Sequence, residues 1–374
     1  MEGSHELRIE ELNSLDAIRA LGPDWNSLEE RSDTHVPSLH PEYVALWLET
    51  LGRRATPRLI TAWAGEELVG YAPFMETIDP FGPLSVRALK FVGNNVGYPG
   101  DILYADIVTS RNHSSATHAI LQHARSAKKI AKWDLGFIAV TSPTLQIAAD
   151  AIGMRPNTLE AMPSQPYVFL ELPDSWEEFL AAHPRADDNY RRRVRRLEKI
   201  GTVRMTTEEQ PDHVVRREGE MLDNHEKWWG TSFKGDWFGD HEVRAFLVDA
   251  AHLLATQGRY IIFTLELNGE PISWSTGVMD GDRFSGLQRS YNRSYATYSP
   301  GTLLDLFTVR YLLSKNISRV QMGPGLGHHK RVLGARVARY VQLRGYRGWR
   351  RIAVGAAGRL GPTRFGGRRQ GLGE

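Results

Sequence analysis

Ionisable side chains follow glycine-rich turns at two places in the sequence. Asp101 comes directly after the breaker-rich loop 93–100 and before a β-type run at 102–107, so its carboxylate could face a cleft and accept a proton. His329 and Lys330 follow a second glycine-rich turn, where they could supply a base and a cation. Each residue also has an ordinary alternative. Asp101 could form an Asx-type turn, His329 could pack in the core, and Lys330 could be solvated on the surface.

The segment Ser299–Thr302 opens an apolar helix that is expected to run to about Lys315. Ser299 suits the N-cap, and Pro300 suits the first helical position because its missing N–H costs nothing there. Gly301 lets another backbone or a ligand approach the helix start closely. A strand–loop–helix with an open N-terminus is a natural anion site, since unpaired N–H groups and the helix dipole both point there. An ordinary capped helix is the alternative.

One arginine and four aromatic residues are further candidates for ligand contacts. Arg289 could pair with phosphates, although exposed arginines are common in loops. Tyr98, Tyr291, Tyr295 and His225 are candidate substrate-binding residues. Packing is the alternative role for all four, because such tyrosines are more often half-buried with a hydrated hydroxyl, and a helix face more often packs on the core.

The composition and the missing motifs exclude several classes of site. Cysteine is absent, which rules out disulfides, thiolate catalysis and thiolate metal sites. The histidines lack a ligand spacing backed by acidic residues, so no metal site is expected. Neither a Walker loop nor a Gly-x-Ser-x-Gly motif appears. The run Gly323–Gly327 lacks the full dinucleotide-binding pattern and the acidic residue expected about 20 positions later.

The elements that position these residues occur in two similar series. Segments 58–75 and 260–279 both read as strand, Gly-Glu turn, strand, aromatic and Met, and each is followed by strand, loop, helix and strand. In the second series, Asn268-Gly269 and Asp280-Gly281 favour the positive φ angles of two-residue hairpins. We interpret the two series as two copies of one α/β unit, joined by a crossing segment at 161–166.

A length of 374 residues also favours two domains. We expect an N-terminal domain at 1–165, a C-terminal domain at 166–350 and a basic Gly/Arg-rich tail at 351–374. No Asp or Glu occurs in 306–373, so this basic end suits a polyanionic partner such as nucleotide phosphates or RNA. The arginine-rich run Tyr190–Lys199 is most simply a solvated helix face.

The sequence also predicts where the chain resides. Its 41% hydrophobic and 24% charged residues are typical of a soluble globular protein. No stretch is apolar enough for a membrane span, and the N-terminus does not resemble a signal peptide. A cytoplasmic location is therefore expected.

In combination, several motifs of the chain resemble those of a known superfamily. They are Tyr298-Ser299-Pro300-Gly301, Leu303-Leu304, Gly323-Pro324-Gly325, Lys330, the arginine-rich helix Tyr190–Gly201, and the element from Phe91-Val92-Gly93 to Asp101. With these motifs the chain, over about residues 35–345, resembles the GNAT-superfamily acyltransferases. More narrowly, it resembles a bacterial group associated with cellulose biosynthesis, which is related to the Fem-type aminoacyltransferases of peptidoglycan synthesis.

The resemblance implies an α/β (α+β) fold of tandem GNAT-like domains, each with a mixed, largely antiparallel sheet flanked by helices. It implies transfer of an acyl group from acetyl-CoA or another acyl-CoA to an amine. Ser299–Thr302 corresponds to the turn that holds the cofactor pyrophosphate, Lys330 to a lysine that stabilises the reacting acyl group, and Asp101 to an aspartate near the acceptor.

The chain departs from the family pattern at three points. The usual pyrophosphate fingerprint is missing near Gln288–Tyr295, Gln321-Met322 replaces an acidic and aromatic pair, and His329 replaces a tyrosine. These departures bear on how the cofactor is held and on the role of that tyrosine.

We therefore expect an enzyme, an acyl-CoA-dependent N-acyltransferase with its cofactor on the C-terminal domain. The acceptor is expected to be a primary amine of a small molecule or a surface-polymer precursor, bound between the domains so that Asp101 lies opposite Lys330. One alternative is a Fem-like aminoacyltransferase that takes its donor from charged tRNA. A second alternative is a non-catalytic double-GNAT scaffold.

Overall fold

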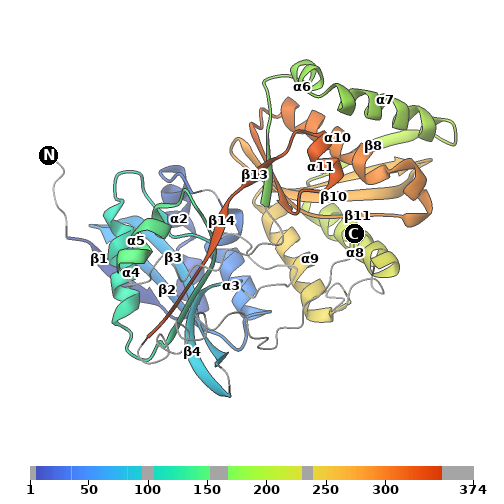
Figure 1. Cartoon of the computed structure of the whole chain (residues 1–374). Coiled ribbons are helices and arrows are strands. Elements are labelled where there is room, and N and C mark those ends of the chain that lie inside the picture. Colours follow the sequence, from blue (N-terminus) through green and yellow to red (C-terminus); the bar gives the residue numbers. More distant parts are fainter. Residues whose placement is uncertain are drawn as a thin grey trace. The chain divides into compact units, whose positions relative to one another are not determined.

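The computed structural model describes residues 6–34, 36–81, 83–94, 105–151, 167–229 and 239–347. The chain divides into two compact units (Figure 1). The first contains residues up to 162 together with those from 340 onward, and the second contains residues 163–339. Within the described residues, no helix combines the length and the apolar character needed to cross a membrane.

The first unit is built on a mixed sheet in which most pairings are antiparallel. The exception is the parallel pair β4–β6, which is joined over only three residues, Ala88–Lys90 with Lys132–Asp134. A short strand, β5 (Val108–Thr109), pairs with β3 at one side. In order across the sheet the strands are β1 (Arg8–Leu12), β2 (Thr56–Ala64), β3 (Glu67–Phe81), β4 (Leu84–Phe91), β6 (Lys132–Ala139) and β14 (Tyr340–Tyr346).

Helices cover both faces of this first sheet. Tyr71 packs edge-on against Trp25 of α2 with ring centroids 4.6 Å apart. The neighbouring Gly70 points to the other face, where the side chains of Ala116 and Ile120 of α4 lie against it. Successive strand residues alternate between faces, so α2 and α4 lie on opposite sides. The helices are α1 (Leu15–Ala20), α2 (Gly22–Glu30), α3 (Pro41–Glu49), α4 (Ser115–Ser126) and α5 (Pro143–Ala151), with a 3-10 turn, η1 (Pro37–Leu39).

The second unit repeats this strand order. Its sheet is again mixed, and its one parallel pair within the described residues is β11–β12. In order the strands are β8 (Val203–Glu208), β9 (Tyr260–Leu267), β10 (Glu270–Asp280), β11 (Arg283–Tyr291), β12 (Arg319–Pro324), β7 (Tyr167–Glu171) and β13 (Arg336–Ala338).

The strand beyond the parallel pair is exchanged between the two sheets. β7 precedes the second series in sequence but completes its sheet, next to β12. β14 follows the second series but completes the first sheet, next to β6. The expected domain boundary at 350 would place β14 in the C-terminal domain, whereas the strand pairs with the sheet of the first unit.

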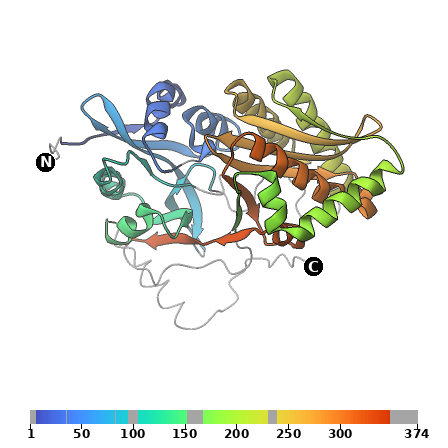
Figure 2. The same cartoon turned by 90° about the horizontal axis from the view of Figure 1, so that it is seen from above.

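Two groups of helices sandwich the second sheet. Arg289 of β11 bonds to Asp305 of α10, and the next residue, Ser290, accepts a hydrogen bond from Asn224 of α8. Adjacent strand residues face opposite ways, so α10 and α8 lie on opposite faces. Figures 1 and 2 show α6 and α7 (green) running beside α10. The elements are α6 (Trp176–Ala182), α7 (Pro184–Glu198), α8 (Pro211–Trp229), α9 (His241–Thr256), η3 (Arg293–Tyr298), α10 (Pro300–Ser314) and α11 (His328–Val332).

α10 is apolar on nearly every side, because it is enclosed by the sheet on one side and by α7 on the other. Leu303, Leu304 and Leu312 are almost fully buried in a core that also contains Phe179 and Phe263. This packing holds the start of α10 in a fixed position over the sheet.

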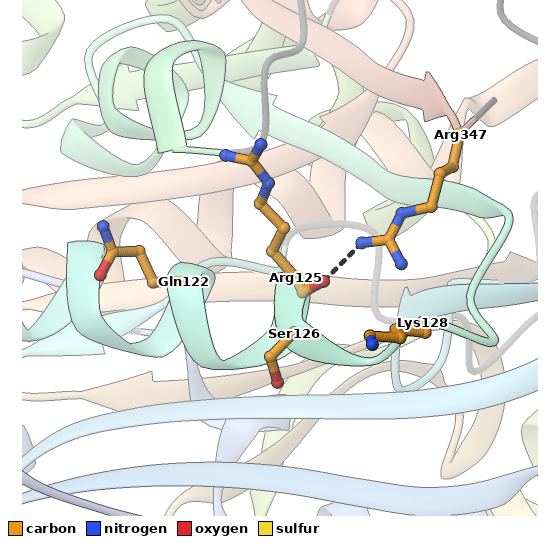
Figure 3. A pocket seen from close by; sticks show the side chains of 5 residues that line it. All are labelled: Gln122, Arg125, Ser126, Lys128 and Arg347. Carbon is orange, nitrogen blue, oxygen red and sulfur yellow. Dashed lines mark hydrogen bonds between the residues drawn. The ribbon is translucent and has the colours of Figure 1, made fainter.

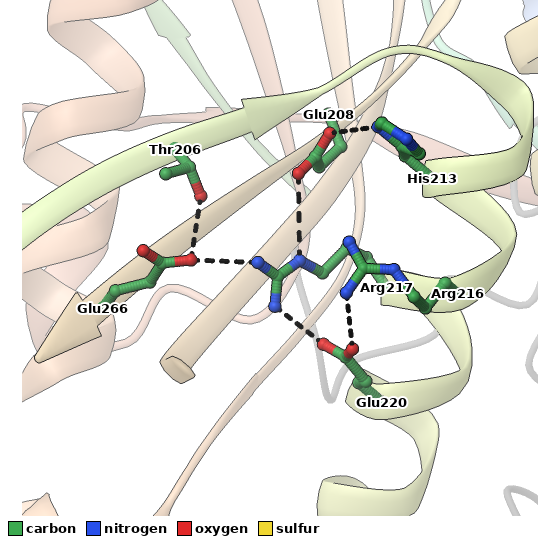
Figure 4. Close-up of polar contacts among 7 residues, drawn as sticks. All are labelled: Thr206, Glu208, His213, Arg216, Arg217, Glu220 and Glu266. Carbon is green, nitrogen blue, oxygen red and sulfur yellow. Dashed lines mark hydrogen bonds and ion pairs between the residues drawn. The ribbon is translucent and has the colours of Figure 1, made fainter. Parts of the chain in front are cut away.

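Polar clusters fix the edges of both units. In the second, Arg217 of α8 donates to Glu266 of β9 (2.9 Å) and to Glu220 of its own helix (2.8 Å), with Glu208 of β8 also in the cluster (Figure 4). In the first, Arg347 donates to the backbone carbonyls of Ala127 (2.9 Å) and Arg125 at the end of α4. These bonds satisfy carbonyls that the helix leaves unpaired.

The end of α4 also borders an open hollow of about 620 Å³. Three of its lining side chains are basic. The lining residues are Gln122, Arg125, Ser126, Lys128 and Arg347 (Figure 3).

The structure confirms the predicted α/β fold with two mixed sheets flanked by helices. Asn268 and Gly269 both have positive φ, as their hairpin requires, while at the second turn it is Gly281 that does. The prediction of a strand at 102–107 is wrong for residues 105–107, the part that the structure describes. These residues form no strand, and the short β5 lies at Val108–Thr109. The expected crossing segment, 161–166, lies outside the described residues.

Candidate functional site

Strands β11 and β12 of the second unit separate soon after they meet. Residues Arg283–Ser285 of β11 pair with Arg319–Gln321 of β12, and the two strands form no further pairs among the described residues. Beyond that point β12 pairs with β7, whereas β11 continues beside β10 to Tyr291. One edge of β11, residues 286–291, is therefore left without a neighbouring strand in the described chain. Such an edge presents backbone N–H and C=O groups to a ligand.

A β-bulge in the pairing of β11 with β10 lies in the same stretch of β11. Gly286 pairs with Gly277 and Arg289 with Ser275, so Leu287 and Gln288 together oppose Thr276. Bulges re-aim side chains and are common near functional sites. Here the side chain of Leu287 is 50% exposed, while Gln288 carries a buried Oε1 that has no hydrogen-bond partner among the described residues.

The start of α10 is open in the way that anion binding requires. Ser299 is the N-cap, as expected, but its backbone is left-handed (φ 53°, ψ 55°) and its hydroxyl makes no capping bond. An N-cap normally has an extended backbone, from which its side chain reaches the next amides. The Ser299 carbonyl accepts from the N–H groups of Thr302 and Leu303. Since Pro300 has no N–H, Gly301 presents an amide that has no partner within the described chain.

Arg289 lies beside this amide. A Cβ on Gly301 would be 3.4 Å from Nη2 of Arg289 and 3.8 Å from a ring carbon of Tyr291. Nη1 of Arg289 donates to both carboxylate oxygens of Asp305, at 3.0 and 2.9 Å. The buried Asp305 thus holds the guanidinium in place, and 39% of the Arg289 side chain stays exposed. The positive charge of Arg289 and the N-terminus of α10 would therefore both attract an anion placed beside Gly301.

Lys330 is buried at the end of β12. Its Nζ donates to the carbonyl of Pro324 (2.8 Å) and lies 3.5 Å from that of Gly323. Burial, together with the charge of Arg289, lowers the pKa of Lys330 from 10.5 to about 8, although Asp305 acts in the opposite direction. The ammonium group is therefore mostly charged at neutral pH but loses its proton more readily than an ordinary lysine does.

His329 is held neutral. Burial, together with the charges of Arg289, Lys330 and His328, lowers its pKa from 6.5 to about 4, although Asp305 acts in the opposite direction. Its Nε2 is buried and has no hydrogen-bond partner in the described part of the chain. At neutral pH the ring carries no charge, and one ring nitrogen can accept a proton or a hydrogen bond.

The structure brings Arg289, Ser299–Thr302, Tyr291, His329 and Lys330 into one region of the second unit. Other expected site residues lie elsewhere or cannot be placed. Tyr295 packs against the apolar core, and His225 lies half-buried on α8, on the opposite face of the sheet from α10. Asp101 and Tyr98 lie outside the described residues. Among the residues that are described, no group of three or more His, Asp or Glu could hold a metal ion.

Sequence reasoning missed two features of this region: the bulge at Leu287-Gln288 and the anchoring role of Asp305. For Asp305 a signal existed, because it is the last acidic residue before Glu374 and interrupts an apolar helix. The bulge had none, since it depends on the register between β10 and β11.

In the first unit, a side chain fills the space beside the equivalent pair of separating strands. β4 and β6 of this unit also part after three pairs, and Gly136 (φ 67°) follows the last pair at the same interval as Gly323 (φ 71°). The side chain of Asn94 fills the space over Gly136, where a Cβ would meet it at 2.8 Å, and donates to the Asp134 carbonyl (2.9 Å). At Gly323 a Cβ would meet no atom of the described residues within 4 Å.

Comparisons with known proteins agree with this geometry. Residues 184–331, which run from the start of α7 into α11, match the family model described as "Acetyltransferase (GNAT) domain". The search of curated proteins found no sequence that matches this chain.

Solved structures with a similar fold cover nearly the whole chain. FemX (13% identity, TM-score 0.58) covers 90% of this chain and 96% of its own. A conserved protein of unknown function from Bacteroides thetaiotaomicron (13%, TM-score 0.54) covers 91% and 100%. The C-terminal domain (DUF2156) of a proposed lysylphosphatidylglycerol synthetase from Agrobacterium fabrum (13%, TM-score 0.53) covers 94% and 99%. Residues 184–331 of this chain are thus similar to a GNAT acetyltransferase domain, and the fold as a whole is similar to that of FemX.

Proposed function

We propose that the chain is an enzyme, an acyl-CoA-dependent N-acyltransferase that moves an acyl group, expected to be acetyl, to a primary amine. The acceptor amine would belong to a small molecule or a surface-polymer precursor. The observation that supports this most is the separation of β11 from β12 beside the open start of α10, within a GNAT acetyltransferase domain. The cytoplasmic location stays an expectation from the sequence.

The residues at the start of α10 fit a nucleotide diphosphate. Gly301 offers an unpartnered amide and no side chain, and Arg289 adds a fixed positive charge next to it. Backbone N–H groups, a helix dipole and a guanidinium are what phosphate oxygens bind in proteins. The free edge of β11 suits the peptide-like arm of coenzyme A, because its amides can pair with an exposed strand as a further strand would.

Acyl transfer requires that the amine nitrogen bond to the thioester carbonyl carbon while the carbon–sulfur bond breaks. Coenzyme A supplies the activated thioester, and its thiolate leaves with a proton. The protein has to stabilise the negative charge that develops on the carbonyl oxygen. Backbone N–H groups on the free edge of β11 and the ammonium of Lys330 are the donors that the second unit offers for this purpose.

The amine must also lose a proton, and two residues are candidates to take it. Asp101 stays a prediction from the sequence. His329 is neutral and its buried Nε2 has no hydrogen-bond partner among the described residues, but a pKa of about 4 makes it a weak base at neutral pH. Because Arg289 contributes to this lowering, a diphosphate bound beside Arg289 would offset part of the positive potential and raise the pKa of His329.

The first unit would not bind the nucleotide in this proposal. Asn94 occupies the space over Gly136, whereas none of the described residues occupies the equivalent space over Gly323 in the second unit. One acyl-CoA per chain is therefore the expected stoichiometry.

Calorimetry with acetyl-CoA tests the proposal, with two glycine variants as a matched pair. Gly301→Ala adds a methyl group where the diphosphate must approach, so we expect affinity to fall by about tenfold or more, equivalent to about 1.4 kcal/mol. Gly219→Ala makes the same change in α8, where a Cβ would meet nothing within 4 Å, and should leave binding unchanged. Both changes favour helix and should not lower the melting temperature. Absence of heat and of a thermal shift with acetyl-CoA would refute the proposal.

The similarity to FemX supports a second candidate, a Fem-like aminoacyltransferase whose donor is aminoacyl-tRNA. The two candidates differ in salt dependence. RNA bound through many phosphates is lost steeply as salt rises, whereas binding of one small nucleotide responds weakly. If neither RNA nor acyl-CoA bound, the non-catalytic scaffold would be the remaining reading.

A further inference from the structure

Helix α7 carries a cluster of arginines beside the start of α10. We call Arg192, Arg193, Arg195 and Arg196 the α7 arginines. The helix is anchored by Tyr190, whose ring packs edge-on against Phe307 of α10 with centroids 5.4 Å apart. Toward its other end, the guanidinium of Arg196 lies 5.4 Å from the ring centroid of Tyr298. Tyr298 directly precedes Ser299, so the C-terminal half of α7 runs along the first turn of α10.

Arg193 of this cluster is half-buried, with part of its guanidinium shielded from solvent. Its Nε and Nη1 atoms are fully buried and have no hydrogen-bond partner in the described part of the chain. Burial lowers the pKa of Arg193, and the charges of Arg192 and Arg196 lower it further, with no carboxylate acting in the opposite direction. Buried guanidinium groups are normally paired, because an unpaired one loses its hydration without compensation.

Arg191, two residues before Arg193, is an example of a paired arginine on the same helix. Its Nε donates to Asp187 at 2.8 Å, and this carboxylate raises its pKa. The contrast indicates that Arg193 is not simply part of a solvated helix face. It is a cation for which the described residues supply no anion.

The chemistry of a guanidinium and the position of α7 indicate which anion could pair with Arg193. A guanidinium fork matches the oxygens of a phosphate group. α7 contacts both α10 and η3, the elements that border the Gly301 amide where we place the diphosphate. A ligand with phosphates at two positions would therefore meet both groups of donors. Coenzyme A is such a ligand, because it carries a diphosphate and, on the same ribose, a separate 3′-phosphate.

We propose that Arg193 and Arg196 bind the ribose 3′-phosphate of coenzyme A, one sugar away from the diphosphate at Gly301. This rests on the proposed function and adds which form of the nucleotide the site selects. The arginines then act in donor binding and discrimination, and not in the bond-forming step.

Titration calorimetry of the full chain with coenzyme A and with 3′-dephospho-coenzyme A tests this directly. The unmodified protein should bind coenzyme A at least about tenfold more tightly than the dephospho form, as expected for loss of a charge-assisted pair. Arg193→Met and Arg196→Gln should each weaken binding of coenzyme A, leave binding of the dephospho form unchanged, and so bring the ratio toward one. Arg191→Gln removes a charge from the same helix outside the cluster and should preserve the ratio.

A thermal melt without ligand separates a binding role from a structural one. Met keeps the aliphatic stem and helix propensity of Arg, so Arg193→Met removes a half-buried charge that has no partner among the described residues and should raise the melting temperature. A lowered melting temperature together with an unchanged ratio would show that Arg193 is structural and overturn the inference.

Other outcomes overturn it in distinguishable ways. Equal affinity of the unmodified protein for the two nucleotides removes the 3′-phosphate site but leaves the proposed function intact. Failure to bind either nucleotide removes the proposed function as well. If a short RNA bound with steep salt dependence and lost affinity in the two variants, while the nucleotide ratio stayed fixed, the α7 arginines would be an RNA site instead.

Discussion

Replacing Lys330 by Met isolates the cost of one buried charge. The pKa of Lys330 falls from 10.5 to about 8, chiefly through burial, so its ammonium destabilises the native state by roughly 3 kcal/mol at neutral pH relative to the neutral amine. Between about pH 8 and 10.5 the unfolded chain holds this proton and the native state does not. Stability therefore rises with pH across that window. Met at this position cannot contribute such a rise.

Urea unfolding of the unmodified protein and of Lys330→Met at pH 7.5, 9 and 10 measures this difference. Because both proteins share every other titrating group, their difference in unfolding free energy should shift by roughly 2–3 kcal/mol in favour of the unmodified protein between the lowest and highest pH. Turnover of the variant should fall by about 10²–10³ if the ammonium stabilises the developing oxyanion.

Two results would refute this reasoning. A difference in unfolding free energy that stays constant with pH would mean that Lys330 keeps an ordinary pKa and is not desolvated at the end of β12. Full turnover in a folded Lys330→Met protein would remove the residue from the reaction. In that case its bond to the Pro324 carbonyl would be structural.

Two further changes test backbone strain and a buried acid. Ser299→Gly should raise the unfolding free energy by about 1 kcal/mol in urea titrations, because Ser299 is left-handed and its hydroxyl makes no cap bond; a loss of stability would show that the hydroxyl matters. Glu218, fully buried against the Tyr260 hydroxyl (2.9 Å), has its pKa raised by burial from 4.5 to about 8, so the native state keeps a proton that the unfolded chain releases. Stability should therefore fall between pH 4.5 and 8 by up to roughly 5 kcal/mol, and Glu218→Gln should abolish that slope; an unchanged slope in the variant would assign it to other groups.

Local pattern was sufficient to predict most elements of this fold. The hairpins around Gly65 and Gly269 follow from alternation and turn residues, and the helix at Pro300–Ser314 follows from its start signals; all of these act over a few neighbouring positions. β8 was missed because its residues are mostly half-exposed and polar, so an edge strand looks like a connecting loop.

Pairing between distant segments could not be predicted in the same way. The register of β14 with β6 joins residues about 200 positions apart, and nothing in Tyr340–Tyr346 encodes which sheet it completes. For the candidate site, the sequence indicated an open helix start at Ser299–Thr302 and two ionisable residues at His329-Lys330. That these lie beside Arg289 depends on where β11 and β12 separate, which is a property of the assembled sheet.

The exchange of β7 and β14 imposes an order on biosynthesis. Until Tyr340–Tyr346 leaves the ribosome, the N-terminal lobe lacks its last strand, and the edge of β6 that β14 will occupy has no pairing strand. An unpaired strand edge of this kind can pair with a strand of another chain and so promote aggregation. Cutting the gene at residue 163 would therefore release an N-terminal piece without its last strand and a C-terminal piece that carries this strand in addition to all of its own.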